Sequence, residues 1–233
     1  MKDIFISTQN YQRTQALCDE LLGVALGVEM AANLGRAGRG KTTAAERIFT
    51  ANPNTVYVLY HEAWSHTELL REIAFRLCGT RPRFRQTCFE MIQTEIGNRR
   101  RIIMVDEADR MNLKCLNVLR NIHDVCKTPI LLIGEEDLKT KMVRERRLIS
   151  RLRDTIWFEP VSQADVVVFY RKALDQQLLP DSATKLLRNA KGDFRNVLTQ
   201  AVKAERIMKA SGIDAITERI VDEICKNGKG QRA

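Results

Sequence analysis

The stretch G-R-A-G-R-G-K-T-T at residues 35–43 decides the fold of this 233-residue chain. It has the Gly-x4-Gly-Lys-Thr spacing of a phosphate-binding loop. Its glycines can adopt positive φ, so successive backbone N–H groups can curl around a phosphate. Lys41 would supply a positive charge to the outer phosphates, and the Thr42 hydroxyl is a ligand for Mg²⁺. The stretch predicts a site for a nucleoside triphosphate with Mg²⁺, whose expected contacts are Gly35, Arg36, Ala37, Gly38, Arg39, Gly40, Lys41, Thr42 and Thr43.

A phosphate-binding loop needs a strand before it and a helix after it, and the flanking sequence fits both. Residues 28–34 are mostly apolar or small, and residues 42–50 are good helix formers that stop before Asn52-Pro53. Further apolar runs predict strands at 55–60, 101–107, 129–134 and 155–159, with helical patterns over 65–78, 86–97, 113–125 and 137–153. Strands that alternate with helices predict an α/β fold with a parallel sheet.

The sequence after Pro160 has only helical periodicity, over residues 163–177, 181–190, 194–210 and 213–225. We therefore expect an α/β core with an N-terminal helix at residues 1–160 and a small helical lid at 161–226. The basic, glycine-containing end at 227–233 is expected to be disordered.

A second chemical motif lies at the end of the strand predicted at 101–107, where apolar residues lead into Asp106 and Glu107. Ligands of open parallel sheets bind beyond the carboxyl ends of the strands, which is also where residues 35–43 fall. Asp106 is the expected partner of Mg²⁺, together with Thr42. Glu107 is the candidate to orient the attacking water in phosphoryl transfer.

Composition narrows the class of protein and of partner. The net charge of +9 exceeds what a nucleotide site needs and favours a polyanionic partner such as nucleic acid, although a basic protein can also be merely soluble. No apolar stretch approaches the roughly 20 residues of a membrane span, and the N-terminus has no signal-peptide pattern. We expect a cytoplasmic protein with no membrane partner. Its six cysteines form no C-x-x-C pair and are expected to be reduced.

Taken together, these motifs resemble those of AAA+ ATPases. The loop at 35–42 matches Walker A, residues 102–107 match Walker B, and the helical end matches the family's lid. The resemblance implies ATP and Mg²⁺ as cofactors and ATP hydrolysis as the activity. Within the lid, G-D-F-R at 192–195 matches the family's G-D-x-R element, which identifies Arg195 as the expected sensor-2 arginine.

AAA+ sites are completed by an arginine from a neighbouring subunit, which implies a homo-oligomer. The basic segment 144–153 occupies the matching stretch, and its Ser-Arg-Leu at 150–152 resembles the finger motif of initiator and clamp-loader relatives. Arg151 is therefore the first choice for the finger and Arg147 the second. The strand expected at 130–134 matches the sensor-1 strand, and Glu135 is the residue considered for its polar contact.

Over residues 8–224 the chain is most similar to the transposition ATPases, the target-selector family of phage Mu and Mu-like phages. This resemblance implies ATP-dependent, sequence-nonspecific binding of duplex DNA as a helical filament, with a transposase as partner and the host cytoplasm as location. About 27 residues precede the first strand, without the amino-terminal helix-turn-helix domain that the phage Mu relative carries. DNA contacts are therefore expected from the ATPase module itself. Arg81, Arg83 and Arg85, in a loop between helices, are the expected contacts, while the arginines at 99–101 are expected to be solvated.

Two other functions stay open on the sequence. One is a replication initiator or loader built on the same ATPase module. The other is a scaffold that uses ATP to assemble on DNA but hydrolyses little of it. Turnover measured with and without duplex DNA separates the scaffold from the hydrolysing enzyme.

Overall fold

The computed structural model describes residues 1–2, 4–23 and 27–227, so most of the tail expected at 227–233 lies outside the described residues. The chain divides into two compact units. The sheet unit comprises Asn10–Arg36 and Gly40–Phe158, and the helical unit comprises Met1–Gln9, Ala37–Arg39 and the chain from Glu159 onward. The phosphate-binding loop thus contributes residues to both units.

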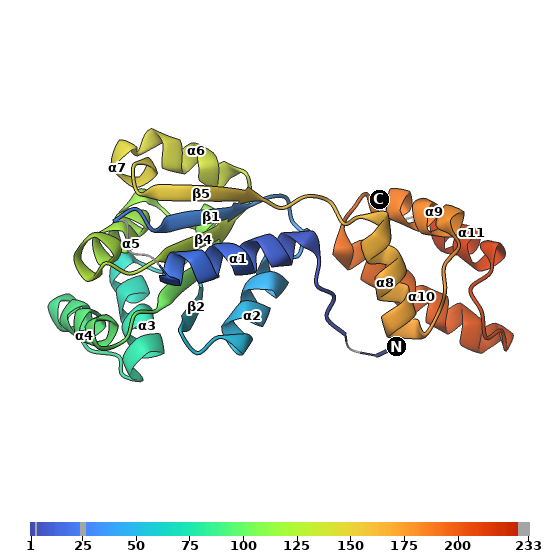
Figure 1. Cartoon of the computed structure of the whole chain (residues 1–233), viewed down its shortest axis with the longest axis horizontal. Helices are drawn as coiled ribbons and strands as arrows, with labels where there is room; N and C mark the ends of the chain where they lie inside the picture. Colours follow the sequence, from blue (N-terminus) through green and yellow to red (C-terminus); the bar gives the residue numbers. More distant parts are fainter. Residues whose placement is uncertain (3, 24–26, 228–233) are drawn as a thin grey trace. The chain divides into compact units, whose positions relative to one another are not determined.

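The sheet unit is built on five parallel strands in the order β2-β3-β4-β1-β5 (Figure 1). The strands are β1 (Met30–Leu34), β2 (Thr55–Leu59), β3 (Ile102–Asp106), β4 (Ile130–Gly134) and β5 (Leu152–Trp157). The three central strands β3, β4 and β1 are buried along their whole length, because helices cover both faces of the sheet. The predicted α/β fold with a parallel sheet is therefore confirmed.

Alternating side chains on each strand pack into two separate cores, one on each face of the sheet. On β3, Ile102 and Met104 pack with the buried residues of α1 (Gln9–Gly23) and α2 (Lys41–Ala51). Ile103 and Val105 point to the opposite core, formed with α3 (His66–Cys78), α4 (Arg85–Asn98) and α5 (Leu113–Cys126). The period of two places Asp106, which follows in the same series as Met104, on the side of α2.

The basic stretch expected to be one helix over 137–153 is not continuous. It forms α6 (Asp137–Arg144) and the short α7 (Arg146–Ile149), interrupted at Glu145 with φ −106° and ψ 89°. Strand β5 then begins at Leu152, earlier than the predicted 155. Pairing with β1 defines it, from Met30 opposite Leu152 through a register shift to Ala31 opposite Asp154. The polar residues of β5 are tolerated because it is an edge strand.

The helical unit has its own apolar core. It contains α8 (Gln163–Leu174), α9 (Pro180–Ala190), α10 (Phe194–Ser211) and α11 (Glu218–Asn227). Buried residues of these helices pack with Ile6, and the Lys2 amide donates to the Ala173 carbonyl at 2.9 Å. Helix α11 begins five residues later than predicted, because the Thr217 carbonyl accepts the first helical bond, from the Val221 amide.

Two further predictions concern membrane spans and cysteines. No helix among the described residues is long and apolar enough to cross a bilayer. All six cysteines are free; Cys18, Cys88 and Cys115 are buried, and burial raises the pKa of the Cys18 thiol to about 12.

Candidate functional site

The phosphate-binding loop joins β1 to α2 at the carboxyl edge of the sheet. Gly40 occupies the position before α2 with φ 86°, and no side chain caps the helix there. The first N–H groups of a helix have no intrahelical partner, so they are available to an anion. Thr42 and Thr43 lie in the first turn of α2, the former half-buried and the latter exposed. The local geometry is that of an anion-binding helix start.

Lys41 is nearly buried, with 9% of its surface exposed. Its Nζ donates to the carbonyls of Gly35 at 2.5 Å and Arg36 at 3.0 Å. Burial lowers the pKa of Lys41 below its usual value, while nearby carboxylates act in the opposite direction. These carboxylates belong to Glu135, Asp106, Asp109 and Glu107. The structure therefore brings the lysine of the loop into the field of the carboxylates that follow β3 and β4.

Asp106 ends β3 and is 2% exposed. Its two carboxylate oxygens each accept one hydrogen bond: Oδ1 from the Glu107 amide at 2.8 Å and Oδ2 from the Tyr57 hydroxyl at 2.9 Å. Burial, followed by the charge of Asp106, raises the pKa of Tyr57 above its usual value, so the hydroxyl stays a neutral donor. Tyr57 is a neighbour of the candidate site that the sequence analysis missed.

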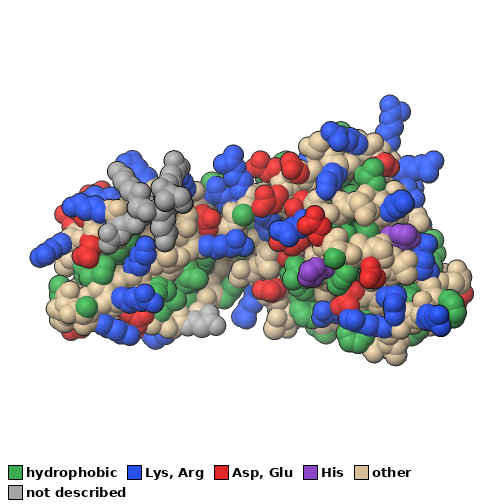
Figure 2. All heavy atoms as spheres, turned by 180° about the vertical axis from the view of Figure 1, so that it is seen from behind, with side chains coloured by type: hydrophobic (Ala, Val, Ile, Leu, Met, Phe, Trp, Pro, Cys, Tyr) green, Lys and Arg blue, Asp and Glu red, His purple; other side chains and the backbone are tan. Residues whose placement is uncertain are grey.

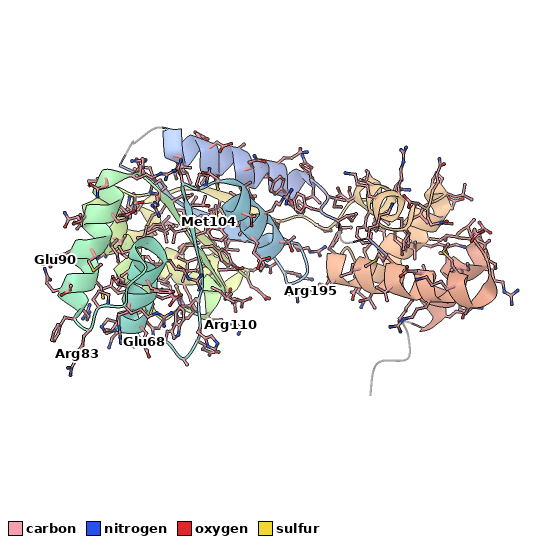
Figure 3. The ribbon with its side chains drawn as sticks, turned by 90° about the horizontal axis from the view of Figure 1, so that it is seen from below. Glu68, Arg83, Glu90, Met104, Arg110 and Arg195 are labelled. Carbon is pink, nitrogen blue, oxygen red and sulfur yellow. The ribbon has the colours of Figure 1, made fainter. Side chains whose placement is uncertain are left out.

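Glu107 adopts a left-handed conformation, with φ 57° and ψ 31°, just before the 3-10 helix η1 (Ala108–Arg110). This turn takes its side chain out of the strand series, and its Oε2 pairs with Arg110 Nε at 2.9 Å. Both side chains remain accessible: Glu107 is 38% exposed and Arg110 is 56% exposed. Figure 3 labels Arg110. The candidate catalytic carboxylate is thus held by a neighbouring cation in this structure.

The turn after β3 is hydrogen-bonded to the end of β4. Asp109 Oδ1 accepts a hydrogen bond from the Glu135 amide at 3.0 Å, and Lys141 Nζ donates to the Asp109 and Met111 carbonyls. A Cβ at Gly134 would lie 2.6 Å from Asp109 Oδ1, so this close approach requires glycine. The exposed side chain of Glu135, considered for sensor 1, follows this contact.

The loop residues that belong to the helical unit contact the start of α10. The Phe194 amide donates to the Gly38 carbonyl at 2.9 Å, and the Arg39 guanidinium donates to the Gly192 carbonyl. Gly38 has φ 76°, and a Cβ there would overlap the Asp193 carboxylate. The G-D-F-R element therefore packs on Ala37–Arg39.

Arg195, labelled in Figure 3, stands in the first turn of α10. Its amide donates to Asp193 Oδ1 at 2.8 Å, which caps the helix.

Arg36, on the sheet unit, pairs weakly with Glu136, with 3.6 Å between Nε and Oε1.

The two finger candidates lie at the amino ends of the strands, whereas Lys41 lies beyond their carboxyl ends. Arg151 directly precedes β5, and its Nε donates to Asp124 Oδ1 at 3.1 Å. Its Nη1 donates to Ser150 Oγ at 2.8 Å, and its side chain is 35% exposed. Arg147 is exposed on α7. Neither arginine can reach the Lys41 site of its own sheet unit, because the length of the strands separates the two ends of the sheet.

The three arginines expected to contact DNA differ in their surroundings. Arg81 Nη2 pairs with Glu72 Oε2 at 2.5 Å, and its guanidinium lies 4.5 Å from the Phe75 ring centroid. Glu72 is buried and also pairs with Arg76, at 2.8 Å. Arg81 is therefore engaged within the chain.

Arg83 and Arg85 are exposed on either side of Phe84, whose side chain is 68% exposed. Figure 3 shows Arg83 pointing away from α3 and α4. Over the face shown in Figure 2, Lys and Arg side chains alternate with Asp and Glu and form no single continuous patch.

The arginines at 99–101 were expected to be solvated, and for two of them this is wrong. Arg101 is 19% exposed and pairs with Glu95 at 2.8 Å. Arg100, 29% exposed, donates to the carbonyls of Lys127 and Leu21. Only Arg99 is exposed. Polar groups that the fold brings to this end of the sheet, invisible in the local sequence, account for the difference.

Comparison with known proteins was consistent with this geometry. A family model described as "AAA domain" matches residues 30–142. A "Potential ATP-binding protein" of Staphylococcus aureus is 24% identical, over 94% of each chain. The "ATP-dependent target DNA activator B" of Escherichia phage D108 is 25% identical over 70% of this chain, a match that spans about half of the phage protein, 54%. The structure of the Aeropyrum pernix ORC2 protein in ADPNP-ADP complexes matches with a TM-score of 0.71 and 12% identity, covering 99% of this chain and 70% of that one.

Proposed function

Because this chain is an AAA+ protein of the phage Mu B type, we propose that it is an ATP-dependent, sequence-nonspecific DNA-binding ATPase. In this proposal it assembles on duplex DNA and delivers that DNA to a transposase. The observation that carries the ATPase part of the proposal is the position of Lys41, Asp106 and Glu107 beyond the carboxyl ends of β1 and β3, at one end of the sheet.

The residues present fit ATP with Mg²⁺. The uncapped start of α2 offers N–H groups to phosphate oxygens, and buried Lys41 offers a positive charge that a phosphate would satisfy better than two carbonyls do. Mg²⁺ is usually bound through one or two protein oxygens plus substrate phosphates, which matches Thr42 and Asp106. Bound Mg²⁺ would neutralise charge on the phosphates.

In the reaction we assign Glu107 the role of holding the attacking water and accepting its proton. Its pairing with Arg110 means that the carboxylate must first leave that partner. We assign Arg195 to the outer phosphate within the subunit. Arg151, or else Arg147, would act on the nucleotide of a neighbouring subunit, which would make the site depend on a homo-oligomer.

The relatives' names and two exposed arginines support a DNA partner: Arg83 in the loop at residues 79–84, and Arg85, which the structure places at the start of α4 and not in the loop. Phage proteins named target DNA activators share sequence with 70% of this chain. Arg83 and Arg85 are exposed, so both could approach phosphates, which nonspecific binding requires. Since Arg81 is held by Glu72, we propose that it supports this loop as well as adding positive charge beside it.

The substitution Lys41→Ala tests the proposal. Fluorescence anisotropy of a labelled duplex, with and without ATP at moderate salt, should show that the variant loses ATP-dependent DNA binding. Lys114→Ala, which removes an exposed lysine of α5, is the control for loss of one charge and should bind as the wild type does. Undiminished ATP-dependent binding by Lys41→Ala would disprove the proposal.

Two alternatives each have a supporting observation. The match to a relative named as an ORC1-type DNA replication protein, 27% identical over 56% of this chain, favours a replication initiator or loader. The Glu107–Arg110 pair favours an ATP-assembled scaffold with little hydrolysis. Turnover that rises on addition of nonspecific duplex DNA would argue against the scaffold, and a requirement for one particular DNA sequence would favour the initiator.

A further inference from the structure

The register of β2 and β3 places a tyrosine beside Asp106. Tyr57 lies opposite Met104, two residues before Asp106, in a parallel pairing that puts Leu59 directly opposite Asp106. Residues two apart on a strand share a face, so Tyr57, Met104 and Asp106 all lie on the α2 side of the sheet. The long tyrosine side chain spans the diagonal, and its hydroxyl is 2.9 Å from Asp106 Oδ2.

The ring of Tyr57 is itself held in place. Its centroid lies 6.0 Å from that of Phe49 on α2, with the planes tilted by 34°. The ring packs against the core shared by α1, α2 and the sheet. Tyr57 thus links the helix that follows the phosphate-binding loop to the carboxylate at the end of β3.

The two bonds to Asp106 fix the plane of its carboxylate. One donor, the Glu107 amide, is backbone, and the other is the Tyr57 hydroxyl. A carboxylate oxygen can accept two hydrogen bonds, so each oxygen keeps a lone pair for water or a cation. Removal of the tyrosine hydroxyl would leave a carboxylate that is 2% exposed free to rotate, with one oxygen lacking its protein donor.

We propose that Tyr57 is a positioning residue: its hydroxyl orients Asp106 for the Mg²⁺ that accompanies bound ATP. This inference rests on the proposed nucleotide site, and it assigns Tyr57 no contact with ATP. Outer partners of this kind orient ligands, and their loss typically lowers metal affinity about 10- to 100-fold.

The test compares Tyr57→Phe with wild type by calorimetric titration of ATP at a series of Mg²⁺ concentrations, and in EDTA. Tyr57→Phe should raise the Mg²⁺ concentration needed for half-maximal enhancement of ATP binding by about 10-fold. ATP affinity in EDTA should stay unchanged. The matched control is Tyr60→Phe, which also removes one hydroxyl, from a buried side chain that bonds to the Trp64 carbonyl and packs in the other core. It should leave the Mg²⁺ dependence unchanged.

Three outcomes would overturn the inference. The first is an unaltered Mg²⁺ dependence in Tyr57→Phe. The second is an equal loss of ATP affinity with Mg²⁺ and in EDTA, since that indicates a general change of shape. The third is the same shift in Tyr60→Phe. Failure of the proposed nucleotide site would look different, because wild-type protein would then bind no ATP under either condition.

Discussion

The pair between Glu107 and Arg110 leads to a quantitative prediction for Arg110→Ala. If the pair holds the catalytic carboxylate away from the water, its removal should raise ATP turnover in the absence of DNA. The Nε to Oε2 distance is 2.9 Å, but both side chains are more than one-third exposed. Such a pair stabilises its closed arrangement by about 0.2–1 kcal/mol. This converts to an increase in kcat of about 1.4- to 5-fold.

The assay is steady-state phosphate release, followed with and without duplex DNA. Wild-type turnover without DNA should also rise with moderate salt, which screens an exposed pair, whereas turnover of Arg110→Ala should not. Arg110→Lys keeps the charge and is the matched control. Unchanged or lower turnover in Arg110→Ala, with unchanged ATP binding, would refute the idea that this pair restrains Glu107.

Three further predictions concern hydrolysis, DNA contacts and stability. Glu107→Gln should bind ATP and keep the assembled form; rapid subunit exchange in light scattering would contradict this. The plot of log affinity for DNA against log salt has a negative slope, and Arg83→Ala should make it less steep by about 0.9. Arg81→Ala should mainly lower stability, by about 1 kcal/mol in urea unfolding, because Glu72 loses one of its two partners. Burial raises the pKa of Cys18 from 9.0 to about 12, so the unfolded chain loses this thiol proton at a lower pH than the folded chain does. The protonated thiol therefore contributes fully to the free energy of unfolding below pH 9. Between pH 9 and about 12 that contribution is lost, by up to about 1.4 kcal/mol per pH unit. Cys18→Ala should remove that part of the pH dependence.

Much of the fold could be read from the sequence because its strongest signals are local. Apolar runs marked the central strands, and the helical pattern over 65–78 marked α3, which begins at His66 after a capping box of Ser65 and Glu68. The phosphate-binding loop and the carboxylates after β3 were likewise found from contiguous residues. Their positions at one edge of the sheet followed from parallel pairing alone.

The features that sequence reasoning missed depend on partners that are not neighbours in the sequence. Strand β5 begins at Leu152 because β1 pairs with it there, although its first residues are polar. Tyr57 reaches Asp106 only in the observed register of β2 and β3. Arg81 looked like its neighbours Arg83 and Arg85, but the buried carboxylate of Glu72, nine residues earlier, engages it. A charged residue on the apolar face of a predicted helix, as Glu72 is, was the one available signal.

The central claim is that ATP makes this chain assemble on duplex DNA. Electron microscopy of the wild-type protein with nonspecific duplex DNA, in the presence and absence of ATP, tests it most directly. The expected result is helical filaments along the DNA that form only with ATP and are missing for Lys41→Ala. Monomers or closed rings with ATP and DNA, or filaments that form equally well without ATP, would contradict it.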